Sequence, residues 1–359
     1  MLKWFKNAKK ENRTDYLTYL GVVLAFIIIA ILNNAGLLPR SRAGQLVPIC
    51  CYIVMAVSLN LTVGILGELS LGHAGFMSVG AFSGVIASQA LAASIPSAPL
   101  RLLIAMVVGA LFAAVAGFII GMPVLRLHGD YLAIVTLAFG EIIKEIINCL
   151  IVGSDANGLH VIFNVKGLKT AEDLNLLEGG KIIIKGAQGA AGTETISSFT
   201  AGFILVMITL IIVLNLVRSR SGRAIMALRD NRIAAESVGI NVTEYKMMGF
   251  VTSATLAGAA GALYGLNYSN LLATKFDFNT SILVLVFVVL GGLGNIWGSI
   301  IAATVLTILP EALRGFDSYR MLVYAIVLIL VMLGTNNEKL KIFFAGLAKK
   351  AKKAKKGGA

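Results

Sequence analysis

Charged residues are scarce in this 359-residue sequence, and their scarcity excludes an ordinary soluble domain. Asp, Glu, Lys and Arg together make up 14% of the residues, whereas globular domains contain about a quarter. Hydrophobic residues make up 57%, and the mean hydropathy is +0.86. Such a composition is typical of a chain that crosses a lipid bilayer several times.

Cysteine is also rare, and its placement argues against a metal site. The three cysteines, Cys50, Cys51 and Cys149, lie in apolar runs and lack the spacing of metal ligands. We interpret them as buried apolar side chains. The sequence therefore predicts no metal and no other cofactor on this chain.

The signatures of common enzymes are missing as well. The sequence contains no G-x-x-x-x-G-K-[ST] loop for nucleotide phosphates, no G-x-S-x-G and no H-E-x-x-H. A membrane enzyme acting on lipid would need an acidic cluster or a pair of histidines at an interface, and none is convincing. These absences favour transport over catalysis.

Long apolar runs dominate what is present. A helix needs about 20 mostly apolar residues to cross a bilayer, and the alternating pattern of membrane β-barrels is missing. We therefore expect an all-α, polytopic membrane helix bundle within residues 16–334, and interpret the first run as an uncleaved span. The expected spans, about ten, are 16–32, 46–63, 76–92, 102–122, 131–152, 199–217, 247–266, 282–290, 299–309 and 322–333.

The net charge of +13 is concentrated in three segments. Residues 1–15 carry +3, residues 218–246 carry +3 and residues 335–359 carry +7. Clusters of Lys and Arg mark cytoplasmic segments, and an even number of spans places both termini on that side. We expect a bacterial-type inner or plasma membrane protein whose lysine-rich tail lies near anionic lipid. No aromatic residues interleave these lysines, so binding to nucleic acid is not favoured.

A long polar insertion, residues 153–198, is expected on the outer side of the membrane. Its stretch 186–192 is rich in glycine and alanine, which is typical of a mobile loop. The insertion is either a loose surface loop or a docking surface for a partner outside the cell, and the sequence favours neither.

Two glycine-rich segments interrupt the apolar pattern. We call residues 64–75 the first glycine-rich segment and residues 291–298 the second. Broken helices at membrane depth are tolerated only inside protein or beside a water-filled path, and paired breaks mark the substrate route in other transporters. We therefore expect two breaks with a substrate path beside them. The candidate path residues are Glu68, Ser70, His73, Asp130, Tyr131, Thr136, Glu141 and Asn295.

Several of these candidates also have simpler interpretations. A single histidine such as His73 is more often structural than a ligand, and Asp130 can cap the helix that it opens. Glu141, Lys144 and Glu145 share one helical face. They are either a polar element of the bundle, where buried charges must pair, or they reach the membrane interface because the helix is shifted.

Four stretches together resemble the LivM-type permease subunits of branched-chain amino acid ABC importers. They are residues 67–76, 125–142, 222–240 and 289–298, of which the second reads LRLHGDYLAIVTLAFGEI and the last VLGGLGNIWG. The four occur in this order from the first third of the chain to near its end. The resemblance therefore covers most of the sequence.

The resemblance implies a set of partners in the lipid bilayer. These are a second homologous permease subunit, two ATP-binding subunits that carry ATP and Mg, and an extracytoplasmic solute-binding protein. In such importers a cytoplasmic loop with the pattern E-A-A-x-x-x-G docks into a groove of the ATPase, and here Ile233 stands in place of the Glu. The alternative is a solvated basic loop. The expected coupling residues are Arg223, Arg229, Asp230, Arg232, Ala234, Ala235, Glu236 and Gly239.

The function implied is that of a permease subunit of an ATP-driven importer for branched-chain or other apolar amino acids. ATP hydrolysis would take place on the partner subunits, so the chain itself is not expected to be an enzyme. The alternative is a stand-alone channel or secondary transporter for a small polar solute such as urea or an amide. In that case Glu141 and Lys144 would carry coupling ions.

Overall fold

The computed structural model describes most of the chain between residues 18 and 313. The described residues are 18–33, 35–36, 39, 43–92, 94–127, 129–155, 158–164, 174, 180–313 and the positions 319, 322–323, 325–326 and 329. The two basic ends, 1–15 and 335–359, lie outside them, as does most of the expected span 322–333. The chain divides into two units, Met1–Ala303 and Thr304–Ala359.

The described part of the chain is mainly helical. Five helical stretches are long and apolar enough to cross a membrane, namely Leu46–Ile65, Ala98–Val124, Phe199–Arg218, Val242–Gly265 and Ala273–Gly291. Shorter apolar helices cover Thr18–Asn33 and Ile296–Ala312. A polytopic bundle is therefore present, whereas a count of about ten spans stays a prediction. The labelled helices are α3 Leu46–Asn60, α4 His73–Ala90, α5 Ala98–Val124, α6 Asp130–Asn148, α7 Phe199–Arg218, α8 Arg220–Asp230, α9 Arg232–Ser237, α10 Val242–Gly265, α11 Phe278–Gly291 and α12 Ile296–Ala312.

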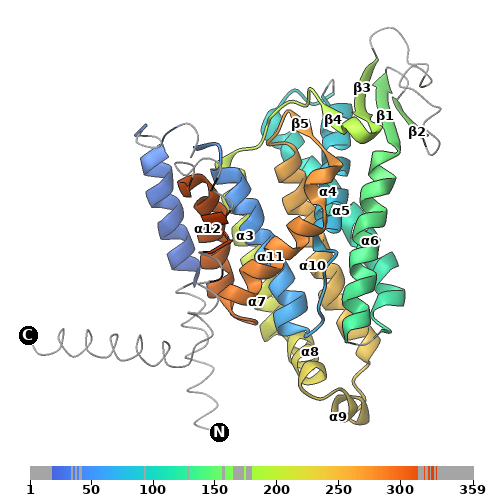
Figure 1. Ribbon diagram of the computed structural model, residues 1–359, viewed down its shortest axis with the longest axis vertical. Helices are drawn as coiled ribbons and strands as arrows, with labels where there is room; N and C mark the ends of the chain where they lie inside the picture. The colour runs from blue at the N-terminus through green and yellow to red at the C-terminus, as the bar shows by residue number, and fades with distance from the viewer. Residues whose placement is uncertain are drawn as a thin grey trace, which may run out of the picture. The chain divides into compact units, whose positions relative to one another are not determined.

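The centre of the first unit is formed by α4, α5 and α10, which pack closely on one another (Figure 1). Glycines make this approach possible: a Cβ on Gly80 of α4 would overlap the backbone of Gly258 on α10, and one on Gly261 would overlap that of Met77. Small residues at helix contacts allow such backbone approach in lipid. The glycines at these contacts thus serve helix packing.

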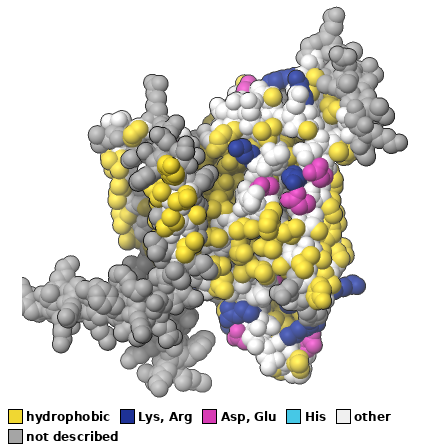
Figure 2. Space-filling view, viewed as in Figure 1, with side chains coloured by type: hydrophobic (Ala, Val, Ile, Leu, Met, Phe, Trp, Pro, Cys, Tyr) yellow, Lys and Arg dark blue, Asp and Glu magenta, His cyan; other side chains and the backbone are white. Residues whose placement is uncertain are grey.

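The outer face of α5 is apolar and open. Val107, Leu111 and Phe118 are each at least half exposed. Figure 2 shows hydrophobic side chains as a wide band on one face, with Lys, Arg, Asp and Glu mostly above and below it. Such a distribution fits a helical body whose side faces hydrocarbon.

The insertion is an antiparallel sheet, which the all-α expectation did not include. Its strands are β1 Leu150–Asp155, β2 Gly158–Phe163, β3 Lys181–Lys185, β4 Ala190–Ala191 and β5 Asn270–Leu271, in the order β2-β1-β3-β4-β5. The stretch 186–192 is not a loose loop but a tight turn, in which Gly189 N–H donates to Gly186 C=O over 2.8 Å. Helix α6 ends at Asn148, so the expected span 131–152 runs too far.

The sheet and the helices α8 and α9 lie at opposite ends of the first unit (Figure 1). Arg101, in the first turn of α5, is 5% exposed and forms an ion pair with Glu194, just after β4. β5 comes from the α10–α11 connection and pairs with β4. The sheet is therefore attached to several helices of the bundle.

Candidate functional site

The polar loop 218–246 folds into two short helices, α8 and α9, each opened by a side-chain cap. Ser219 Oγ accepts a hydrogen bond from Gly222 N–H over 3.0 Å, and Asn231 Oδ1 accepts one from Ala234 N–H over 3.1 Å. Ser and Asn are favoured at this position because they satisfy amides that have no partner in the helix. α8 buries Gly222, Ile225 and Leu228 against the bundle.

Helix α9 presents an apolar surface to solvent. Ile233 is 80% exposed and Val238 is 75% exposed, more than any other large hydrophobic residue in the described chain. Ala234 is exposed beside them, whereas Ala235 is 4% exposed and lies inside. Of the two alanines in the expected motif, only Ala234 is therefore available to a partner. Gly239 ends the helix with a positive φ of 86°, which favours glycine.

The charged residues of the loop divide into two groups. Arg232 pairs with Glu236 over 2.9 Å within α9, and Arg223 donates to the C=O of Arg218 over 2.8 Å. Both contacts stay within the loop and are exposed. Arg229 instead donates a hydrogen bond to Gly64 in the helix bundle. It also pairs with Asp230 over 3.0 Å.

The contact of Arg229 is with the first glycine-rich segment. Here α3 continues as a π-helix, Leu61–Ile65, and Glu68 N–H bonds to Thr62 C=O over 3.1 Å. In an α-helix that amide would bond to Gly64 C=O. The Gly64 carbonyl is instead met by Arg229 Nη1 over 2.9 Å. A cation at the C-terminal end of a helix is electrostatically favourable.

Gly67 allows the side chain of Arg229 to lie flat on this segment. Its φ is +79°, and a Cβ at this position would come within 2.6 Å of Arg229 Cγ. Ile225 of α8 and Leu66 of the segment lie together beside Gly249 of α10. Helix α8 thus rests on the first glycine-rich segment through one polar and one apolar contact.

Glu68 and Lys246 form a buried ion pair close by. Lys246, near the start of α10, donates to Glu68 Oε1, and the two side chains are 8% and 12% exposed respectively. Charges removed from water need a partner, so each of these residues requires the other. The pair joins the end of the loop 218–246 to the first glycine-rich segment.

The second glycine-rich segment contacts the first through Asn60. Its Oδ1 accepts a hydrogen bond from Gly294 N–H over 2.8 Å, and its Nδ2 donates to Ser299 Oγ over 3.1 Å. A Cβ on Gly64 would overlap both Asn60 Oδ1 and the backbone of Gly294. We call these four residues, Asn60, Gly64, Gly294 and Ser299, the glycine junction. Asn295 beside it caps α12 by accepting from Gly298 N–H over 3.3 Å.

The other candidates in the first glycine-rich segment, and Thr136 of α6 which contacts it, are buried. His73 is 2% exposed and its Nε2 lies 2.8 Å from Ser58 Oγ, which agrees with the structural interpretation of this residue. Thr136 Oγ1 accepts from Leu71 N–H over 3.0 Å. Ser70 is 1% exposed, and its hydroxyl has no hydrogen-bond partner within the described residues.

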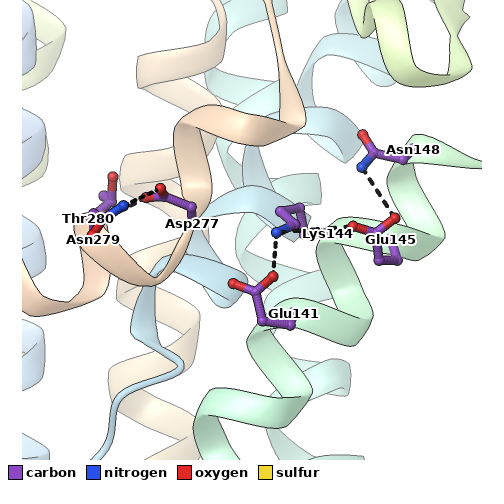
Figure 3. A network of polar contacts seen from close by, with 7 residues as sticks. All are labelled: Glu141, Lys144, Glu145, Asn148, Asp277, Asn279 and Thr280. Carbon is purple, nitrogen blue, oxygen red and sulfur yellow. Dashed lines mark hydrogen bonds and ion pairs between the residues drawn. The ribbon is translucent and has the colours of Figure 1, made fainter.

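Glu141 belongs to a polar network between α6 and the start of α11 (Figure 3). Lys144 pairs with Glu141 and lies 3.9 Å from Glu145, on the side of α6 that faces Asp277. Asp277 caps α11 by accepting from Thr280 N–H over 3.0 Å. Lys144 is 18% exposed and Glu141 is 38% exposed, so the network is a partly open surface.

Two candidates lie at the start of α6. The N-cap position belongs to Gly129, with a φ of 61°, so Asp130 is the first helical residue and not the capping residue that was expected. Tyr131 is 72% exposed.

Sequence analysis missed the residues that connect these elements. Asn60 lies in the apolar run 46–63, where a polar side chain is expected to face protein and to have a partner, whereas Lys246 is the last residue of the basic loop 218–246. That rule would have singled out Asn60. It would not have identified the partners, because the contacts of Asn60 join residues more than 230 positions apart in the sequence.

Comparisons with known proteins agree with the resemblance to branched-chain amino acid permeases. A family profile described as "Branched-chain amino acid transport system / permease component" matches residues 42–332. The chain is 35% identical to the high-affinity branched-chain amino acid transport system permease protein LivM of Escherichia coli (strain K12) over 292 residues, 79% of this chain and 66% of that protein. It thus spans slightly less than two thirds of that relative.

Other relatives are more distant. The chain is 26% identical to the permease protein BraD of a Pseudomonas aeruginosa high-affinity branched-chain amino acid transport system, over 79% of this chain and 89% of that protein. It is 25% identical to the fructose import permease protein FruG of Bifidobacterium longum, over 87% and 88%. No solved structure matches the chain.

Proposed function

Since this chain belongs to the branched-chain amino acid transport system permease family, we propose that it is a transmembrane permease subunit of an ATP-driven importer. Its cargo is a branched-chain or other apolar amino acid, as the names of LivM and BraD favour. Its multi-pass helices lie in the inner or plasma membrane. ATP and Mg are bound by separate ATPase subunits.

The observation that carries this proposal is the apolar surface of α9. Ile233 and Val238 are the most exposed large hydrophobic residues described, and they lie at the polar end of the unit, away from the sheet. A contiguous apolar patch rimmed by charge is typical of a protein interaction site, and we interpret Ile233, Ala234 and Val238 as such a patch. We assign this surface to the ATPase, with Arg223, Asp230, Arg232, Ala234 and Glu236 around it.

The remaining partners follow from the two ends of the unit. With α8 and α9 on the cytoplasmic side, the sheet faces outward, where it meets the solute-binding protein, and both termini are cytoplasmic. The charged surface of Glu141, Lys144 and Asp277 is costly beside lipid and favours contact with the second permease or a water-filled path. The substrate path runs near the first glycine-rich segment, where the buried hydroxyl of Ser70 has no hydrogen-bond partner among the described residues.

The test of ATPase docking compares a double variant in α9 with a control variant in the sheet, at the opposite end of the unit. We expect I233D/V238D to reduce copurification of the ATPase subunit at least about tenfold, because two apolar contacts are replaced by buried charges. V161D is the control, since Val161 is 52% exposed on β2 in the sheet. Equal ATPase recovery with both proteins would refute the assignment of α9.

The test of function is uptake by the reconstituted complex. We expect leucine uptake into proteoliposomes to require ATP on the side of α9 and the solute-binding protein on the other. The alternative function, a channel or secondary transporter for urea or an amide, predicts uptake by the purified chain alone, driven by a gradient. That result would reject the importer.

A further inference from the structure

The loop 218–246 and the two glycine-rich segments meet at one place in the first unit. Arg229 of α8 bonds to Gly64, and Gly64 lies against Gly294 with Asn60 between them. The three elements are far apart in sequence but share this glycine junction. Helix α8 is therefore connected directly to the contact between the two segments.

Arg229 connects the loop 218–246 to the glycine junction by a side-chain hydrogen bond. The π-helix leaves Gly64 C=O without the amide of residue 68, which bonds to Thr62 instead. A carbonyl at a helix end needs another donor when it is partly buried. Arg229 Nη1 supplies that donor from α8.

The junction itself is held by few bonds and leaves no spare room. Asn60 uses both ends of its amide, one for Gly294 N–H and one for Ser299 Oγ. Gly64 and Gly294 lie so close that no Cβ fits on Gly64. Because the fit is tight, we expect a small shift of Gly64 to be transmitted to the contact between the two segments.

We propose that Arg229 is a positioning residue that holds the glycine junction closed, and that movement of α8 by the ATPase withdraws it and opens the junction. The proposal rests on the proposed function, because it names how the docking loop acts on the bundle. It also changes the role of Arg229. Arg229 acts within this chain, whereas its neighbours on α9 contact the ATPase.

A merely structural role for Arg229 makes a different prediction. If Arg229 only caps the π-helix that continues α3, its loss destabilises the C-terminal end of that helix. Nucleotide then has no effect on the second glycine-rich segment. If Arg229 controls the junction, the backbone amide of Gly294 becomes exchangeable both when Arg229 is replaced and when the ATPase closes. The readout is therefore hydrogen–deuterium exchange of a peptide covering residues 291–298, measured in the intact complex in nanodiscs.

The variants are R229Q, R229K and the control R220A. Arg220 is exposed on the same helix, so its replacement removes an equal charge without touching Gly64. We expect R229Q to raise exchange of the 291–298 peptide about tenfold, the effect of one lost charge-assisted hydrogen bond. R229K, which keeps the charge and one donor, gives a smaller rise, and R220A gives none. Gel filtration and circular dichroism verify that each variant is folded.

The second part of the experiment measures the same exchange in the presence of nucleotide. In the parent complex, ATP with vanadate should raise exchange of the same peptide, and in R229Q it should add little. Equal exchange in R229Q and R220A would overturn the role of Arg229. A rise in R229Q with no response to nucleotide in the parent would overturn the coupling, even though the ATPase copurifies. Loss of copurification from the parent itself would instead count against the proposed function.

Discussion

The buried ion pair between Glu68 and Lys246 gives the sharpest stability prediction. Both side chains are nearly inaccessible, at 12% and 8% exposure, so neither charge can be hydrated once its partner is removed. Removing one partner of such a pair costs about 3–5 kcal/mol. E68L and K246M should each lower the free energy of unfolding by about this amount.

The double variant separates pairing from packing. E68L/K246M removes both charges and fills similar volume with apolar atoms, which is often neutral for buried pairs. The double variant should therefore lose far less free energy of unfolding than the two single variants lose together. Equilibrium unfolding in mixed micelles of dodecyl maltoside and SDS, followed by circular dichroism, measures all four proteins.

An exposed pair on α9 provides the control. Arg232 and Glu236 are 40% and 46% exposed, so R232A should cost no more than about 0.5 kcal/mol. Losses of that small size in E68L and K246M would refute the burial argument. They would show that the first glycine-rich segment admits water around the pair.

Three further substitutions test the packing of the site. G64A should lower stability by about 1–3 kcal/mol through overlap at the junction, whereas G249A, whose Cβ would meet nothing closer than 3.5 Å, should be tolerated; thermal unfolding in detergent compares them. T136V leaves the amide of Leu71 without its acceptor and should cost about 1–3 kcal/mol, while T136S should restore it in the same assay. K144M leaves the α6 carboxylates unpaired and should cost about 1 kcal/mol, discounted for their exposure, with K144R close to the parent in chemical unfolding.

Composition and apolar runs were sufficient to predict the membrane class and most helices. The runs behind α3, α5, α7 and α10 correspond to helices whose ends lie within about five residues of the expected bounds. The run 131–152 misled at its end, because the apolar residues Leu150–Val152 suit a buried strand as well as a helix. The sheet was missed for the same reason, and because β5 comes from a distant loop.

The candidate site was predictable in its parts but not in its assembly. The caps at Ser219 and Asn231 and the turn at Gly239 follow from local sequence, since each depends on a hydrogen bond to a residue three positions away. The Glu68–Lys246 and Arg229–Gly64 contacts join residues 178 and 165 positions apart. No periodicity in one sequence specifies such pairs, because they depend on how helices pack.

Helix α10 has a consequence for how information travels through this protein. Its 24 residues make a rod about 36 Å long. The N-terminal part of this helix carries Lys246, and the connection after its C-terminal end contributes β5 to the sheet. The buried ion pair with Glu68 and the sheet are therefore tied to one continuous helix. A displacement applied at one end of such a rigid element is carried to the other end as a shift of the whole helix.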